Sequence, residues 1–162
     1  MKKRVSKILL IFILLGIIIL KIFFVDYIVI SGDSMSDTYL DGEVVLIKKR
    51  YTELNRYDVV VVYTKEQGIR GKVIKRIIGL PNETVQIIDG YVYINGVKLE
   101  DDVVNIKMEY AGIAEAEIEL ADDEYFLLGD NRNSSRDSRN EWMGVVNEAQ
   151  IIGEVFFKLL NK

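Results

Sequence analysis

Residues 84–99 read Thr-Val-Gln-Ile-Ile-Asp-Gly-Tyr-Val-Tyr-Ile-Asn-Gly-Val-Lys-Leu, and this stretch decides the fold class. Its β-branched and aromatic residues fall into short blocks, a composition that is typical of strands. The dipeptide Asn95-Gly96 separates the second block from Val97, and a type I′ hairpin turn prefers this pair because both central residues need a positive φ. The stretch therefore predicts antiparallel strands joined by a tight turn.

The same strand pattern continues on both sides of this hairpin. No long amphipathic helix competes with it beyond residue 26, although residues 110–117 and 148–152 each have room for a short helix. No internal repeat or low-complexity tract interrupts the pattern, so the sequence predicts one mainly β domain. Blocks rich in Val, Ile and Tyr predict its strands at residues 43–47, 58–63, 84–88, 90–94, 117–120 and 124–128.

The composition limits the chemistry that this domain can perform. The chain has 162 residues, a formal net charge of −4, and neither His nor Cys. Disulfides, thiol nucleophiles, His-based zinc sites and Ser-His-Asp triads are therefore excluded. Any catalysis must use hydroxyl, carboxylate, Lys or Arg side chains.

The N-terminal segment is more apolar than a folded domain requires. Residues 8–20 are all apolar or Gly, and the apolar run resumes after Lys21. A helix over this segment would be about 30 Å long, close to the hydrocarbon thickness of a bilayer. A removable signal peptide is the alternative, but residues 23–27 lack the small residues of a cleavage site. We therefore expect one N-terminal transmembrane helix at residues 8–25.

The charges around this helix predict its orientation. Basic residues crowd its first end, within residues 1–7, so the positive-inside rule places that end in the cytoplasm. Residues 26–162 are then expected to form the extracytoplasmic domain of a single-pass membrane protein. With Pro81 as the only proline and no Gly/Ser linker, this domain is expected to sit against the lipid bilayer.

A first polar segment, residues 31–38, follows the apolar run of residues 27–30. It presents Ser34 close to Gly32, and a hydroxyl on such a turn can lie near backbone N–H groups, as an acyl-transfer nucleophile requires. Most clusters of Ser, Gly and Asp are ordinary turns. Taken alone, this segment indicates a turn more than a site.

A second segment, residues 72–81, contains a Lys among apolar neighbours. Two-residue alternation places Lys75 on the same strand face as Val73 and Ile77, with Arg76 on the other face. Burial lowers the pKa of a Lys from about 10.4 by roughly 3 to 5 and so turns it into a base. The alternative is a surface Lys that extends past its neighbours, and a partner hydroxyl would decide between the two.

A third segment, residues 129–139, interleaves acidic, basic and hydroxyl side chains directly after an apolar strand. Its simplest interpretation is a solvated loop, but such spacing also suits a pre-organised polar shell around a site. In a chain without His, a Ser-Lys pair supported by such a shell is the main hydrolytic option.

Together the three segments resemble the bacterial type I signal peptidases, in the short single-span form typical of Gram-positive bacteria. The resemblance spans nearly the whole chain, because the segments follow the family's order after an N-terminal anchor. It implies a mostly antiparallel β catalytic domain with a reduced second β region between Pro81 and Gly129. The matching motifs are Ser34-Met35-Ser36-Asp37-Thr38, Lys75-Arg76-Ile77-Ile78-Gly79-Leu80-Pro81, and Gly129 to Arg139.

The resemblance also assigns roles to individual residues. It implies that Ser34 is the nucleophile and Lys75 the general base of a serine endopeptidase that needs no cofactor or metal. Ser135 matches the family's Lys-orienting hydroxyl, and Asp137 and Arg139 match a supporting ion pair. The backbone N–H of Ser34 is expected to stabilise the oxyanion.

The implied substrate is a preprotein that carries a signal peptide, with small residues at the first and third positions before the cut. It would bind as an extended strand beside residues 27–30 and 72–75. The walls of its binding pocket are expected to include Ile30, Met35, Tyr39 and Ile74.

Two departures from the family pattern keep other functions open. Asp37 stands where the family has Pro, and Asn140-Glu141 lengthens the step from Arg139 to the aromatic Trp142. They suggest a peptidase dedicated to few clients, or a non-proteolytic factor in the assembly of surface fibres. A self-cleaving repressor also uses a Ser-Lys pair, but the acidic balance and the lack of a helix-turn-helix before Ser34 argue against a nucleic-acid partner.

Overall fold

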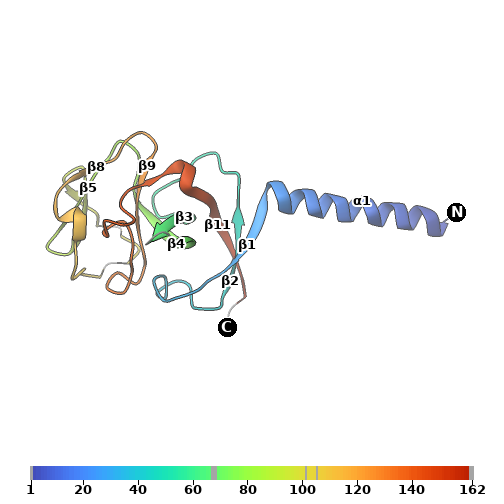
Figure 1. The fold of residues 1–162 in the computed structure, drawn as a ribbon, viewed down its shortest axis with the longest axis horizontal. Coiled ribbons are helices and arrows are strands. Elements are labelled where there is room, and N and C mark those ends of the chain that lie inside the picture. Colours follow the sequence, from blue (N-terminus) through green and yellow to red (C-terminus); the bar gives the residue numbers. More distant parts are fainter. Residues whose placement is uncertain (1, 67–68, 101, 105, 161–162) are drawn as a thin grey trace.

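The computed structural model describes residues 2–66, 69–100, 102–104 and 106–160. Helix α1 (Lys2–Phe23) extends away from the strands (Figure 1), and side chains such as Ile8 and Phe12 are more than half exposed. The first strand begins at Val25, so a single residue, Phe24, separates helix and sheet. A helix thus lies where the anchor was expected, but none of the helices within the described residues combines the length and apolarity that crossing a bilayer demands.

The larger sheet carries the N- and C-terminal strands of the β domain. All of its neighbouring strands are antiparallel, as the sequence predicted. Its order is β1-β2-β11-β3-β4-β9-β10. These strands are β1 (Val25–Val29), β2 (Val44–Lys48), β3 (Val59–Glu66), β4 (Ile69–Gly79), β9 (Glu124–Leu128), β10 (Val146–Asn147) and β11 (Ile151–Leu160).

The predicted second β region is a separate four-stranded sheet at the end of the molecule far from α1 (Figure 1). The predicted hairpin is confirmed: Asn95 and Gly96 have φ of 51° and 74°, and Ile94 pairs with Val97. The order is β7-β6-β5-β8, with β5 (Thr84–Ile88), β6 (Tyr91–Ile94), β7 (Val97–Lys98) and β8 (Ile118–Glu119). Two short 3₁₀ helices, η1 (Gly112–Glu115) and η2 (Glu148–Gln150), lie within the two stretches where the sequence left room for a short helix.

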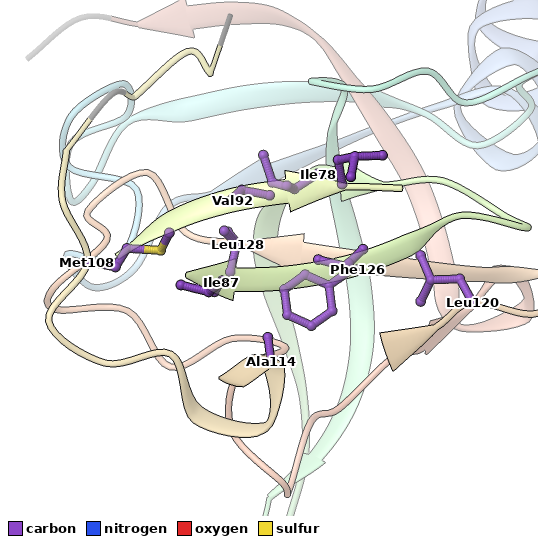
Figure 2. Packing of buried hydrophobic residues seen from close by; sticks show 10 residues of the cluster. Ile78, Ile87, Val92, Met108, Ala114, Leu120, Phe126 and Leu128 are labelled. Carbon is purple, nitrogen blue, oxygen red and sulfur yellow. The ribbon is translucent and has the colours of Figure 1, made fainter. Parts of the chain in front are cut away.

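An apolar cluster joins the two sheets (Figure 2). Ile78 of β4 and Phe126 and Leu128 of β9 are completely buried against residues of the second sheet such as Val85. Burying each such side chain contributes about 1.5 to 3 kcal/mol. Gly79 allows the close approach, because a Cβ at this position would lie 2.5 Å from Val85 Cγ2 and 2.9 Å from Phe126 Cβ. The cluster fixes β4, which contains most of the second polar segment, and β9, which leads into the third.

Strand β11 was not predicted. It lies between β2 and β3 and is therefore an interior strand of the larger sheet. Its register against β2 shifts between Val155 and Phe157 and again between Lys158 and Leu160. Such bulges break the two-residue alternation by which a half-buried strand is recognised.

Candidate active site

Ser34 lies in a turn that follows β1. The carbonyl of Met35 accepts hydrogen bonds from the N–H groups of Thr38 (2.9 Å) and Tyr39 (2.7 Å), so one helical turn follows directly after Ser34. Met35 is 1% exposed and anchors this turn in the core. The N–H of Asn131 donates to the Ser34 carbonyl at 3.1 Å, which holds the first polar segment against the third.

Lys75 meets Ser34 across 41 positions of sequence. Its Nζ lies 2.8 Å from Ser34 Oγ and donates at 2.9 Å to the carbonyl of Ile74. The same 2.8 Å separation also allows the opposite hydrogen bond, in which the Ser34 hydroxyl donates to a neutral Lys75 amine. In that arrangement the amine can take the hydroxyl proton. The Lys75 side chain is 3% exposed, so this contact is shielded from bulk water.

The surroundings of Lys75 make it a base near neutral pH. Burial lowers its pKa to about 8 from the ordinary value of 10.5, because water is removed from the charged form. The carboxylates of Asp137 and Asp130 act against this effect and raise the pKa, while the guanidinium of Arg136 lowers it further. About a tenth of the Lys75 side chains are then neutral at pH 7.

Arg76 forms a buried ion pair that the sequence did not predict. Its Nε and Nη2 donate to Asp130 Oδ1 and Oδ2 at 2.8 and 2.5 Å, and Thr38 Oγ1 donates to the same carboxylate at 2.5 Å. Ile74, Lys75 and Arg76 are all buried, so both faces of β4 are covered here. The alternation that placed Arg76 on the face opposite Lys75 therefore does not separate core from surface. The pair connects all three polar segments.

The predicted partners Asp137 and Arg139 do lie together. Arg139 Nε and Nη2 donate to Asp137 Oδ1 and Oδ2 at 2.8 and 2.9 Å, and both side chains are buried. Asp137 Oδ2 also accepts the N–H of Gly129 at 3.0 Å. The pair thereby fixes the loop that leaves β9.

Ser135 packs beside the reacting residues, but the expected hydrogen bond to Lys75 is not present. Its Oγ is buried and, among the residues that the structure describes, has no hydrogen-bond partner. A Cβ at Gly129 would lie 2.1 Å from Ser135 Oγ and 2.5 Å from the Ser34 carbonyl oxygen. Only glycine therefore lets the third segment approach the nucleophile so closely.

A cavity of about 100 Å³, here called the first pocket, opens beside Ser34 and Lys75 between β1 and β4. Of the four predicted wall residues, Ile30 and Ile74 line it, whereas Met35 and Tyr39 pack in the apolar cluster behind them. Strand β1 is at the edge of its sheet, and β4 pairs with β9 only from Arg76 onward. An extended peptide therefore has two strand edges to pair with.

The contact between Ser34 and Lys75 favours acyl transfer to a hydroxyl that is assisted by an amine. In the described part of the chain, no group of three or more Asp or Glu side chains is placed to hold a metal ion. A larger hollow of about 800 Å³ lies over the second sheet, but neither Ser34 nor Lys75 lines it. Ser34 and Lys75 both line the smaller pocket.

Comparisons with known proteins agree with this assignment. The family model described as "Signal peptidase, peptidase S26" matches residues 2–160. Signal peptidase I of Bacillus licheniformis is 33% identical over 164 residues, covering 93% of this chain and 86% of the relative. Signal peptidase I T of Bacillus subtilis (strain 168) is 35% identical over 165 residues, covering 94% of this chain and 83% of the relative.

A solved structure agrees as well. The crystal structure of a signal peptidase I from Enterococcus faecalis V583 is 30% identical and aligns with a TM-score of 0.50, covering 66% of this chain and all of that one. The family model spans nearly the entire sequence, and the relatives match over most of their own length. The chain therefore belongs to the bacterial type I signal peptidases of peptidase family S26.

Proposed function

We propose that this protein is a serine endopeptidase that removes signal peptides from exported preproteins, with Ser34 as nucleophile and Lys75 as general base. The observation that carries the proposal is the 2.8 Å contact between Lys75 Nζ and Ser34 Oγ, in a buried site where the pKa of the amine falls to about 8. Membership of the signal peptidase family supports the same reaction.

In the first half of the reaction, neutral Lys75 takes the proton from Ser34 Oγ as this oxygen attacks the scissile carbonyl carbon. The backbone N–H of Ser34 stabilises the negative oxygen that forms. The protonated amine of Lys75 then gives its proton to the leaving nitrogen as the peptide bond breaks, which leaves the signal peptide as an ester on Ser34.

The second half hydrolyses this ester. Lys75, neutral again, takes a proton from a water molecule as the water oxygen attacks the ester carbonyl. Collapse of the intermediate returns the proton to Ser34 Oγ and releases the signal peptide with a free carboxylate. The cycle needs no group beyond the chain and water.

The substrate binds as an extended strand between β1 and residues 69–75 of β4. A pocket of about 100 Å³ with walls from Ile30 and Ile74 admits only small side chains at the first and third positions before the cut. Met35 and Tyr39 support these walls from the core.

Three residues of the third segment support the reacting pair. Asp137 and Arg139 hold the loop in place through their ion pair. Ser135 orients the amine of Lys75: its buried Oγ lies close to the Ser34 carbonyl and has no hydrogen-bond partner in the described residues, so its bonding capacity is left for the amine.

The protein acts from the membrane surface. Residues 8–25 form a single anchor, with residues 1–7 in the cytoplasm and residues 26–162 outside the membrane. Support comes from the apolar run of residues 8–20, from the basic residues before it, and from the exposure of its apolar side chains on α1. The lipid bilayer then covers these side chains.

The curated relatives compared above are all signal peptidases, so they give no support to a non-proteolytic factor in fibre assembly. A panel of preproteins tests the proposal. Purified full-length protein in detergent is expected to cut a preprotein with Ala at the first and third positions before the cut, and to spare the same preprotein with Leu at either position. Equal cleavage of all three, or of none, would contradict it.

A further inference from the structure

A second cavity, here called the leaving-side pocket, meets the first pocket at the reacting pair. Its volume is about 190 Å³, against about 100 Å³ for the first pocket. The two share Ser31, Ser34, Val73 and Lys75, but their other walls differ. Those of the leaving-side pocket are Gly32 and Asp33 of the first polar segment, Ser134 and Arg136 of the third, and Trp142, which follows the third. The two cavities therefore adjoin at the reacting pair, the first beside strands β1 and β4 and the second beside residues 31–34 and 134–142.

We infer that the leaving-side pocket binds the second residue of the mature protein, and that Trp142 makes it prefer a large apolar side chain there. The inference rests on the proposed function. Since the scissile carbonyl lies at Ser34 Oγ and the signal-peptide side occupies the first pocket, the mature side must continue past Lys75 into the other one. Side chains of an extended peptide alternate, so the first and third residues before the cut share a face with the second residue after it.

The size and the walls of this pocket decide what it accepts. It has nearly twice the volume of the first pocket, so a side chain excluded there fits here. Asp33 and Arg136 contribute opposite charges, so the pocket does not present a field of one sign. The aromatic ring of Trp142 then dominates recognition, because it offers the largest apolar contact area among the lining side chains.

The position of Trp142 follows from the lengthened step that distinguishes this sequence. The carbonyl of Asn140 accepts the N–H groups of Met143 (3.0 Å) and Gly144 (2.9 Å), which closes a turn around Trp142. The side chain of Asn140 accepts the N–H of Asp137 at 3.1 Å. The turn is thereby attached to the loop that carries the supporting ion pair, and Trp142 keeps a fixed place beside Ser34.

Cleavage kinetics test the preference. Peptides that differ only at the second residue after the cut, with Phe, Leu or Gly, are compared in parent, Trp142→Phe and Trp142→Ala full-length proteins. The parent is expected to cleave the Phe and Leu peptides with a kcat/KM about tenfold above that of the Gly peptide. Trp142→Phe keeps most of this ratio and Trp142→Ala brings it toward one. The same exchange at the first residue after the cut is the control, and its ratio does not depend on Trp142.

Fluorescence gives a test that leaves Trp142 unchanged. Trp142 is the only tryptophan of the chain, so its emission reports this site alone. In the Ser34→Ala protein, a tryptophan-free peptide that spans the cut is expected to shift the emission, and the same peptide truncated at the cut is not. A shift from both peptides, or from neither while the longer one binds by calorimetry, would overturn the inference.

The outcomes separate this inference from the proposed function. If the parent protein cuts no peptide of the set, the proposed peptidase fails, and the emission data still show whether the mature side occupies the pocket. If the parent cuts but its Phe-to-Gly ratio equals that of Trp142→Ala, only the inference about the leaving-side pocket is wrong.

Discussion

At the scale of the residue, the site depends on a single amine kept out of water. Lys75 is buried between apolar neighbours and two carboxylates that act on its charge in the opposite sense to burial. The effect of burial on the pKa of Lys75 is larger than that of the two carboxylates. The pKa is therefore about 8, below its ordinary value of 10.5. A chain without histidine thus contains an amine that is partly neutral near neutral pH.

This pKa predicts the pH dependence of cleavage. The active form is neutral Lys75, so kcat/KM should rise with pH and level off above an inflection at about 8. Between pH 7 and pH 9 the neutral fraction grows from about a tenth to about nine tenths. Initial rates with a peptide substrate at low concentration, from pH 6 to pH 10, measure the profile. A rate that falls over this range would contradict the role of Lys75.

Ser135 predicts a partial loss of activity. If its hydroxyl orients Lys75, Ser135→Ala removes one hydrogen bond at the transition state, and the rate should fall about ten- to a hundredfold. The inflection near pH 8 should remain, because burial and not Ser135 is the main cause of the lowered pKa. A pH-rate profile beside that of the parent measures both quantities. An unchanged rate would place Ser135 outside the site.

At the scale of the element, the Arg76–Asp130 pair joins strand β4 to the loop that follows β9. Asp130 is completely buried, so Asp130→Asn leaves the guanidinium of Arg76 without a counter-charge. The free energy of unfolding should fall by about 3 to 5 kcal/mol. Denaturant titration of the purified protein measures this value.

A more exposed pair in the same sheet is the matched control. Lys48 and Glu154 are 2.8 Å apart, and their side chains are 41% and 12% exposed, against 9% and 0% for Arg76 and Asp130. Glu154→Gln should change the free energy of unfolding by no more than about 1 kcal/mol. Equal losses in the two variants would show that burial does not strengthen the Arg76–Asp130 pair.

Elements with a strong local signal could be predicted from the sequence. The turn at Asn95-Gly96 depends on the φ preferences of two residues, and blocks such as residues 84–88 and 124–128 have the predicted bounds. Strand β11 could not be predicted, because its bulges hide the alternation and its partners are distant in sequence. Local patterns do not record such long-range pairing.

The same limit applies to the site. The motif could nominate Ser34 and Lys75, and the structure places them in contact. The alternation rule put Arg76 on the face opposite Lys75, and only the structure shows that Arg76 is buried there with Asp130. Which of the predicted wall residues line the first pocket also depends on how β1 and β4 approach each other.

At the scale of the whole molecule, the strand that follows α1 leads to the first pocket, which Ile28, Val29 and Ile30 line. Four antiparallel pairings connect β1 to β4 through β2, β11 and β3, so β1 and β4 run in the same direction. Both strands therefore lead from the α1 end of the molecule toward Ser34 and Lys75 (Figure 1). A signal peptide held in the membrane beside α1 would enter the first pocket from that end.

This arrangement predicts the topology of the protein in the cell. The basic residues before the apolar segment should keep the N-terminus in the cytoplasm. Protease added to intact protoplasts should therefore digest residues 26–162 while a cytoplasmic marker protein survives. Protection of this domain would contradict an extracytoplasmic active site.

The most direct test of the account is cleavage of one preprotein by three forms of the full-length protein in detergent at pH 9. The parent is expected to release a mature product whose N-terminal sequence begins directly after the small residue at the cut. Ser34→Ala and Lys75→Ala, both folded by circular dichroism, are expected to release none, because each lacks one half of the reacting pair. Release of the same product at the parent rate by either variant would contradict the assignment of Ser34 and Lys75.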